Sequence, residues 1–277
     1  MNKRELVEYF ESTGFRPKQR LGQNFLVDPN LTRKLVDCTE LEPGDTVVEI
    51  GPGMGMISRE ILGRGVKLIA VERDAALKSY LESALLNQYP DSLTLIDGDA
   101  VDLPLGGAKN PELTKVIANP PFSITGPWLA GILDLGFPKR LSLLLQKEAV
   151  DRITAQAGSK LFGVLAMRLE AAYEVVHTHP VPPSCFYPAP QVESRIVVFH
   201  RRETPYCFTS ATLELVQMLF TQRRKQIGAR LKKVLSPELL ISWQHILESH
   251  NLDFQSRPEQ IPTHVWIELD RAATKEA

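Results

Sequence analysis

Residues 46–65 constrain the fold of this chain more than any other segment. They begin with TVVEI, a β-branched run typical of a buried strand, pass through the glycine cluster GPGMG, and continue in a helical pattern that ends near Gly63 or Gly65. A strand, a tight glycine turn and a helix form the opening unit of a doubly wound sheet. We therefore expect further strands and helices to alternate downstream.

Apolar runs separated by helical patterns continue this alternation. The pattern predicts four more strands, at 67–74, 92–100, 115–122 and 140–148. It also predicts two more helices, at 75–89 and 128–136. This order favours an α/β fold with a mainly parallel sheet and helices on both faces. Two later strands, near 173–178 and 194–200, have no long helix between them, so we expect them to pair antiparallel at the sheet edge.

Helical patterns replace strand patterns after about residue 202. Three stretches read as helices: ATLELVQMLFTQRRKQIGARLKKVL, PELLISWQHILESH and PTHVWIELDRAATK. We expect two domains, an α/β domain with an N-terminal arm over residues 1–207 and a small helical domain over residues 208–277. A length of 277 residues is enough for one large and one small domain.

Composition excludes several classes of protein. The chain has 32 Lys and Arg against 33 Asp and Glu, which argues against a uniformly basic nucleic-acid-coating protein but not against a local basic face. Its three cysteines are far apart, so neither a disulfide framework nor a thiolate metal site is expected. The acidic N-terminus resembles no targeting signal, and no run approaches the ~18 apolar residues of a membrane span. We expect a cytoplasmic protein without a metal or a membrane partner, and nothing requires more than a monomer.

Acidic residues follow the strands in a way that suits a nucleotide. Glu72 follows Gly51 by roughly the 20 residues that separate a glycine turn from the acid that binds a ribose diol. A dinucleotide fingerprint would need its third glycine where Met56 stands, which disfavours a nicotinamide cofactor. Asp99, at the end of the next strand, offers an acceptor for an adenine amine. The alternative is a glycine turn that only connects strand and helix, followed by solvated acidic turns.

The tetrapeptide Asn119-Pro120-Pro121-Phe122 follows a predicted strand and suits chemistry at an adenine amine. The lone pair of that amine is delocalised into the ring, so the amine is a poor nucleophile. The Asn119 side-chain oxygen and the Pro120 carbonyl can accept both N–H bonds and leave the lone pair facing a methyl donor. Phe122 can stack on the base. The alternative is a proline turn with an Asn cap and one core Phe.

Taken together, these motifs resemble those of the ribosomal RNA adenine N6,N6-dimethyltransferases that act on the small subunit. The matching segments follow one another along nearly the whole chain: RLGQNFL (20–26), EIGPGMG (49–55), VERD (71–74), GDA (98–100), NPPF (119–122), QKE (146–148), GSKLFG (158–163), FYPAPQVES (186–194) and FTQRRKQIGARLKK (220–233). The resemblance implies the class I S-adenosylmethionine-dependent methyltransferase fold, Rossmann-like with antiparallel edge strands, plus a small C-terminal helical domain.

The resemblance also implies a site. A pocket for S-adenosylmethionine would be lined by Asn24, Leu26, Gly51, Glu72, Asp99 and Asn119. Within it, Gly51 would approach the methionine portion, Glu72 the ribose and Asp99 the adenine, while Asn119 would touch both donor and target amine. The implied reaction is two methyl transfers to each of two adjacent adenosines in a hairpin loop near the 3′ end of small-subunit rRNA. The implied partner is the small ribosomal subunit or its assembly precursor.

One motif departs from the family pattern. Small-subunit members typically read Asn-Leu-Pro-Tyr where this chain reads Asn-Pro-Pro-Phe, so Phe122 keeps the stacking ring and loses the hydroxyl. The same motif occurs in DNA adenine and protein glutamine methyltransferases, which remain alternatives opposed by the QNFL arm and the C-terminal helices. A ribosome-assembly factor that acts mainly by binding is a further alternative.

A basic segment near the C-terminus is the predicted RNA contact. Between residues 215 and 237 there are six basic residues and no acidic one: Arg223, Arg224, Lys225, Arg230, Lys232 and Lys233. On one continuous helix, Phe220, Ile227, Leu231 and Val234 would share an apolar face and leave a positive surface for phosphate. A solvated charged helix is the alternative.

Arg16, Lys18 and Arg20, beside the predicted active-site arm, also favour nucleic acid. The target adenine must leave its stack to reach Asn119, which is easier in a loop than in a duplex.

Overall fold

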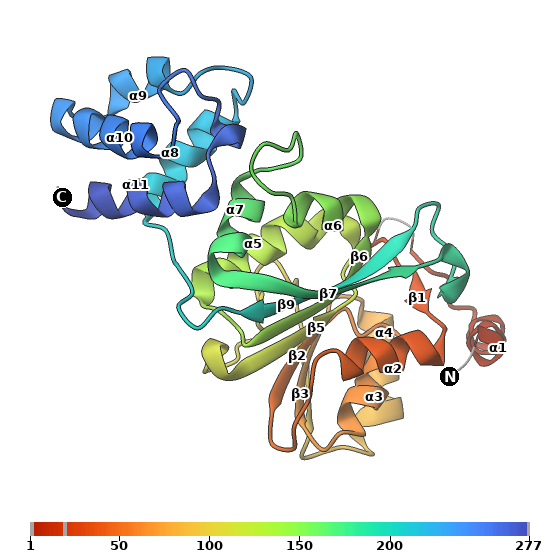
Figure 1. Ribbon diagram of the computed structural model, residues 1–277. Coiled ribbons are helices and arrows are strands. Elements are labelled where there is room, and N and C mark those ends of the chain that lie inside the picture. Colours follow the sequence, from red (N-terminus) through yellow and green to blue (C-terminus); the bar gives the residue numbers. More distant parts are fainter. Residues whose placement is uncertain (1–2, 19–20, 276–277) are drawn as a thin grey trace. The chain divides into compact units, whose positions relative to one another are not determined.

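A computed structural model describes residues 3–18 and 21–275 of the chain. The chain forms two compact units, each described here by itself (Figure 1). The first comprises Met1–Val150 and Glu174–Arg201, and the second comprises Asp151–Tyr173 and Arg202–Ala277.

The first unit is built on a seven-stranded sheet in the order β4-β3-β2-β5-β6-β9-β7. Its strands are β2 (Thr46–Ile50), β3 (Lys67–Glu72), β4 (Leu93–Asp97), β5 (Thr114–Ala118), β6 (Arg140–Gln146), β7 (Tyr173–Val181) and β9 (Ser194–Arg201). The pairs from β4 to β6 are parallel, and β9 runs antiparallel to β6. The predicted, mainly parallel sheet with an antiparallel strand near its edge is confirmed.

Both faces of this sheet are covered, which explains why its strands are apolar runs rather than alternating ones. The neighbouring residues Val47 and Val48 point to opposite faces, and both are 0% exposed. Figure 1 shows one group of helices on one side of the sheet, α2 (Pro29–Asp37), α3 (Met56–Leu62) and α4 (Ala75–Leu81), and a second group on the other, α5 (Thr125–Leu135) and α6 (Lys147–Ile153). The predicted helix over 75–89 ends as α4 at Leu81 and continues as a π-helical turn, Glu82–Leu86.

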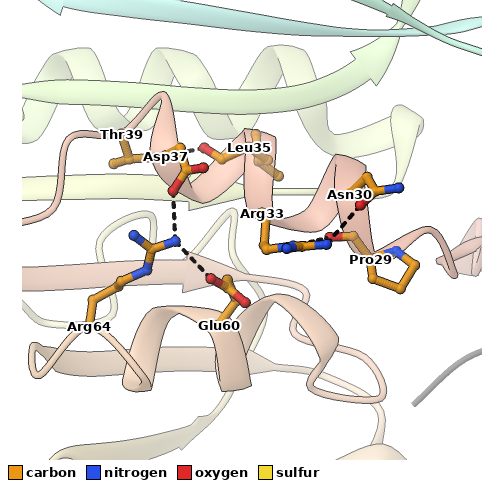
Figure 2. Close-up of polar contacts among 8 residues, drawn as sticks. All are labelled: Pro29, Asn30, Arg33, Leu35, Asp37, Thr39, Glu60 and Arg64. Atoms are coloured by element: carbon orange, nitrogen blue, oxygen red, sulfur yellow. Dashed lines mark hydrogen bonds and ion pairs between the residues drawn. The ribbon is translucent and has the colours of Figure 1, made fainter.

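Helices α2 and α3 are joined at the surface by one arginine (Figure 2). The Arg64 guanidinium donates to Asp37 at the end of α2 over 2.6 Å and to Glu60 of α3 over 2.8 Å. Buried side chains of both helices, Leu35 and Ile61, pack in the core beneath the sheet face. Because the ion pairs are exposed, the apolar packing contributes most of the stability of this layer.

The N-terminal segment packs on the end of the sheet unit. Helix α1 (Lys3–Thr13) buries Leu6 and Phe10 in a cluster with Phe25, Met54 and Leu77. A two-stranded antiparallel sheet joins β1 (Phe25–Leu26) to β8 (Phe186–Tyr187). Short 3-10 turns occur at Pro111–Leu113, Phe122–Ile124 and Pro183–Cys185.

The second unit is helical, and its extent differs from the predicted boundary at residue 207. It contains α7 (Val164–Ala172), α8 (Ser210–Phe220), α9 (Gly228–Val234), α10 (Pro237–Ser249), α11 (Thr263–Lys275) and the 3-10 turn Pro258–Gln260. Phe162 and Met167 precede the predicted boundary, yet they pack in one core with Trp243 and Trp266. The segment Asp151–Tyr173 therefore belongs with the C-terminal helices, because it supplies part of their apolar core.

The basic segment is not one continuous helix. Helix α8 ends at Phe220 and α9 begins at Gly228. The N–H groups of Ile227 and Gly228 donate to the carbonyls of Ser256 and Phe254 over 3.0 and 2.9 Å. These bonds to a loop distant in sequence replace the hydrogen bonds that a continuous helix would form. The predicted apolar face is therefore wrong at its far end, where Val234 is 54% exposed.

Candidate active site

A pocket lies where the parallel strands β2, β3, β4 and β5 end, as ligand sites of open α/β sheets do. Residues from the arm, the glycine turn and the ends of three further strands line it. All six predicted donor residues are among them: Asn24, Leu26, Gly51, Glu72, Asp99 and Asn119. The fold thus brings residues from five distant segments to one cavity.

The glycine turn leaves backbone exposed to this cavity. Gly51, Gly53 and Gly55 have φ values of +71°, +58° and +70°, a region that L side chains rarely adopt. A Cβ at Gly51 would lie 3.3 Å from the carbonyl oxygen of Asn119, and one at Gly53 would lie 3.0 Å from the Phe25 ring. Only glycine fits this backbone path and its close neighbours, and the path brings Gly51 and Gly53 to the lining of the cavity.

Glu72 is buried at the end of β3, with 7% of its surface exposed. Its Oε2 accepts from the N–H of Gly53 over 3.1 Å, and its Oε1 accepts from the N–H of Asp74 over 2.8 Å. Burial raises the pKa of Glu72, although these backbone hydrogen bonds oppose the shift. The carboxylate is oriented by both bonds, and its remaining lone pairs can accept from a pair of vicinal hydroxyls.

Asp99 lines the same cavity but is already engaged. Its Oδ2 accepts from Arg73 over 2.7 Å, and its Oδ1 accepts from the N–H of Val101 over 2.9 Å. Arg73 is exposed, so a ligand amine can share the carboxylate with it without a large desolvation penalty.

Asn119 follows β5 and faces the cavity. Its Nδ2 donates to the carbonyl oxygen of Asn24 over 3.4 Å, a long hydrogen bond. Pro120 is buried, and Phe122 begins the following 3-10 turn. Neither of them lines the cavity. Pro121 and Ser123 line it beside Asn119 instead.

Two features were not predicted, one in strand β2 beside the pocket and one in the pocket wall. Glu49 is 1% exposed and accepts from the Ser58 hydroxyl over 2.6 Å, while its Oε1 has no partner. Burial raises the pKa of Glu49 to about 8. The apolar wall formed by Met54 and Leu77 is backed by helix α1. The spacing of Leu6 and Phe10 was the available signal for α1, and the place of Glu49 within a strand expected to be buried was the available signal for its burial.

The second unit carries a basic groove, which we define by the lining residues Arg224, Lys225, Arg230, Lys233 and Arg257 together with Gln222, Gln226, Gln255 and Gln260. None of the described residues that line it is acidic. Arg257 was missed because it is distant in sequence from the predicted basic segment. Lys232 is exposed but does not line the groove.

Two predicted RNA contacts also have partners within their own unit. Arg223 donates to the carbonyl of Phe162 over 3.1 Å and lies 3.8 Å from Glu259. Lys18 pairs with the buried Asp74 carboxylate over 2.8 Å. In both cases a residue distant in the sequence binds a cationic side chain that the sequence pattern assigned to RNA. Arg20 lies outside the described residues.

Within residues 3–18 and 21–275, no group of three or more His, Cys, Asp or Glu side chains is arranged to hold a metal ion. In the same described part of the chain, no helix is long and apolar enough to cross a membrane.

Comparisons with known proteins point to one family. The family model for ribosomal RNA adenine dimethylase matches residues 14–264. The chain is 42% identical over 264 residues to a ribosomal RNA small subunit methyltransferase A of Opitutus terrae, covering 95% of each chain. It is 34% identical over 263 residues to the protein of the same name from Thermotoga maritima, covering 95% of this chain and 87% of that one.

Solved structures support the fold. A dimethyladenosine transferase from Plasmodium falciparum superposes with a TM-score of 0.73 at 22% identity, over 90% of this chain and 97% of that one. The 23S rRNA methyltransferase ErmE superposes with a TM-score of 0.66 at 22% identity, over 90% of this chain and 99% of that one. These likenesses confirm the predicted class I methyltransferase fold. With a match that spans most of its length, the chain belongs to the ribosomal RNA adenine dimethylase family.

Proposed function

We propose that this protein dimethylates the N6 amines of two adjacent adenosines in a hairpin loop near the 3′ end of small-subunit rRNA, with S-adenosylmethionine as methyl donor. The observation that carries the proposal is the meeting of Asn119, Glu72 and the glycine turn in one pocket of a chain from this family. We expect it to act in the cytoplasm, as a monomer, on the small subunit or an assembly precursor during ribosome biogenesis.

The residues of the pocket fit the proposed donor. The backbone of Gly51, which lines the pocket, can contact the methionine portion, the oriented carboxylate of Glu72 can accept from both ribose hydroxyls, and Asp99 can accept from the adenine amine. Asn24 and Leu26 close the pocket from the arm. The donor supplies an electrophilic methyl group on a sulfonium. Attack on that methyl needs alignment more than a strong base.

The catalytic motif fits the proposed target. In the proposed role, the Asn119 side-chain oxygen and the Pro120 carbonyl accept the two N–H bonds of the adenine amine, so that its lone pair faces the methyl group. The ring of Phe122, in the turn that follows, stacks on the base. This arrangement requires a base that has left its stack, which a hairpin loop provides more readily than a duplex.

The basic groove of the second unit fits RNA phosphate. Its arginines bind phosphate through paired N–H groups, its lysines add point charges, and its glutamines can donate to phosphate or to the ribose 2′-hydroxyl. We infer that the groove supplies most of the salt-dependent affinity for the RNA.

Replacing Lys225, Arg230 and Lys233 together with alanine will weaken binding to small-subunit RNA by about one to two orders of magnitude. The slope of log K against log salt will fall by about three, since each lost phosphate contact reduces it by about one. Affinity for the donor will not change. Filter binding at several salt concentrations measures both quantities.

A matched control removes the same charge elsewhere. Lys67, Lys109 and Lys139 line a shallow groove at the opposite, amino ends of the strands. Their joint replacement with alanine will leave the slope within about one of the wild-type value. Equal losses in the two triple variants would contradict a role for the basic groove.

The activity itself is tested with labelled S-adenosylmethionine. Undermethylated small subunits, naked small-subunit RNA, DNA and protein are offered in parallel, and nucleosides are separated after digestion. We expect label in N6,N6-dimethyladenosine from the RNA of the small subunit. Label only on DNA or on protein glutamine would overturn the proposal, and a product that stops at the monomethyl stage would locate the difference in the Asn-Pro-Pro-Phe motif.

A further inference from the structure

Asp74 is a buried carboxylate outside the predicted site, and three parts of the first unit meet at it. Its side chain is 1% exposed. Its Oδ2 accepts from Lys18 Nζ and from Gln23 Nε2, both over 2.8 Å, and its Oδ1 accepts from the N–H of Ala76 at the start of α4. Burial would raise the pKa of Asp74, but the bonds from Lys18 and Gln23 outweigh it and hold that pKa below its usual value.

The bond from Gln23 connects Asp74 to the arm that closes the pocket. Gln23 is also fixed on its other side, because its Oε1 accepts from the backbone N–H of Lys18 over 2.7 Å. With both ends of its amide bound, Gln23 has one orientation. The backbone that follows it is therefore held in place, including the carbonyl of Asn24.

That carbonyl contacts the catalytic motif. Asn24 O accepts from the Nδ2 of Asn119 over 3.4 Å. The neighbouring arm residue Gly22 packs on the same motif, since a Cβ built there would lie 3.2 Å from the Cβ of Pro121. A short chain of contacts thus runs from Asp74 through Gln23 and Asn24 to Asn119.

This chain determines which end of the Asn119 amide is free. With Nδ2 donating to Asn24, the oxygen Oδ1 is left to accept from a substrate amine. If the Asn24 carbonyl moves, the amide can rotate and present its NH₂ group to the amine, which repels it. Asn24 and Asn119 also line the donor pocket, but Gly51, Glu72 and Asp99 stay in place when the amide rotates, so we expect little change in donor affinity.

We propose that Asp74 is a positioning residue that, through Gln23 and the carbonyl of Asn24, holds the Asn119 amide in the orientation that methyl transfer requires. The inference rests on the proposed function, because it concerns the same reaction. Asp74 touches neither donor nor target in this proposal.

Exchanging the carboxylate of Asp74 and the amide of Gln23 tests this proposal. Asp74→Asn keeps a good cap for α4, but its NH₂ group meets that of Gln23, whose oxygen is already committed to Lys18. Gln23→Glu places two carboxylates against each other. The double variant Gln23→Glu/Asp74→Asn restores one donor and one acceptor, and the new glutamate supplies the charge that Lys18 pairs with.

We expect each single variant to lower kcat at least tenfold and the double variant to recover to within about threefold of wild type. The Kd for S-adenosylhomocysteine, by calorimetry, will stay within about threefold throughout. In the ligand-free protein, the ¹⁵N signals of the Asn119 side-chain amide will shift in the single variants and return in the double variant. If Asp74→Asn does not fold, Gln23→Met carries the same expectation, since it leaves the Asp74 bonds to Lys18 and Ala76 intact.

Single variants with wild-type kcat would overturn the inference, as would a double variant no faster than the slower single one. A loss that appears only in S-adenosylhomocysteine affinity would also overturn it. These failures require an active wild type; an inactive wild type would overturn the proposed function instead.

Discussion

Replacing Asn119 with alanine will lower kcat for methyl transfer by about 10³. The substitution removes the side-chain oxygen that accepts from the adenine amine, and losing one such preorganised polar group typically costs 10²–10³ in rate. The loss of the hydrogen bond to the Asn24 carbonyl adds to this, because it weakens the contact between the arm and the motif. Single-turnover methylation of undermethylated small subunits, with saturating donor, measures the chemical step directly.

The same variant separates catalysis from binding. Asn87→Ala is the matched control, because that asparagine is exposed on the same unit and away from the pocket. It should keep full activity. If Asn119→Ala abolishes methylation while binding to subunit precursors and their maturation stay normal, assembly through binding is the main role. An Asn119→Ala variant with near wild-type kcat would contradict the proposed catalytic motif.

Raising the pH from 5 to 8 will destabilise the first unit through Glu49 by about 4 kcal/mol, with each pH unit contributing about 1.4 kcal/mol. Its pKa is raised by burial from 4.5 in the unfolded chain to about 8 in the fold. Between these values the unfolded chain releases a proton that the folded protein keeps. The contribution of Glu49 is therefore fully present below pH 4.5 and is lost as pH rises through 8.

Glu49→Gln will remove this dependence, because the amide does not titrate. The stability difference between the variant and wild type will move in favour of the variant by about 4 kcal/mol from pH 5 to pH 8. An NH₂ group without an acceptor at the unpartnered Oε1 position adds a destabilisation that does not change with pH. Hydrogen exchange of the β2 and β5 amides, corrected for intrinsic rates, reports the free energy of unfolding of this unit.

The exposed Glu11→Gln is the control for this measurement, and it should keep the wild-type pH dependence. A constant difference between Glu49→Gln and wild type across the range would show that Glu49 ionises normally. In that case a hydrogen-bond partner in solution would have to compensate for the burial of the charged Glu49 carboxylate.

The mainly parallel direction of the strands could be predicted because it follows from local patterns, whereas their order in the sheet was not predicted. The runs at 46–50 and 140–146 are mostly apolar and are buried on both faces, which is typical of parallel strands covered by helices on both sides. The glycine turn was equally predictable, since Gly51 and Gly53 adopt backbone angles that other residues avoid. The placement of Glu72 followed from these two features.

The break in the helix predicted over 211–235 could not be foreseen. The sequence pattern is helical throughout, but a loop distant in the sequence packs against the middle of the segment. Phe254 lies where a Cβ at position 228 would stand, 2.6 Å away, so only glycine fits there. The same loop brings Arg257 to the basic groove. A contact between segments so far apart in the sequence does not alter the hydrophobic periodicity of either segment.

Short-range regularities therefore determined the strands and the glycine turn, since each of these is encoded within a few consecutive residues, whereas the set of donor-pocket residues was completed by the family resemblance. Only the tertiary structure decided which charges remain available. Arg223 and Lys18 have the sequence character of RNA contacts, yet Phe162 and Asp74 engage them, while Glu49 is buried deeply enough to hold its proton near neutral pH. Charge and protonation depend on neighbours brought together by folding, and those neighbours are distant in the sequence.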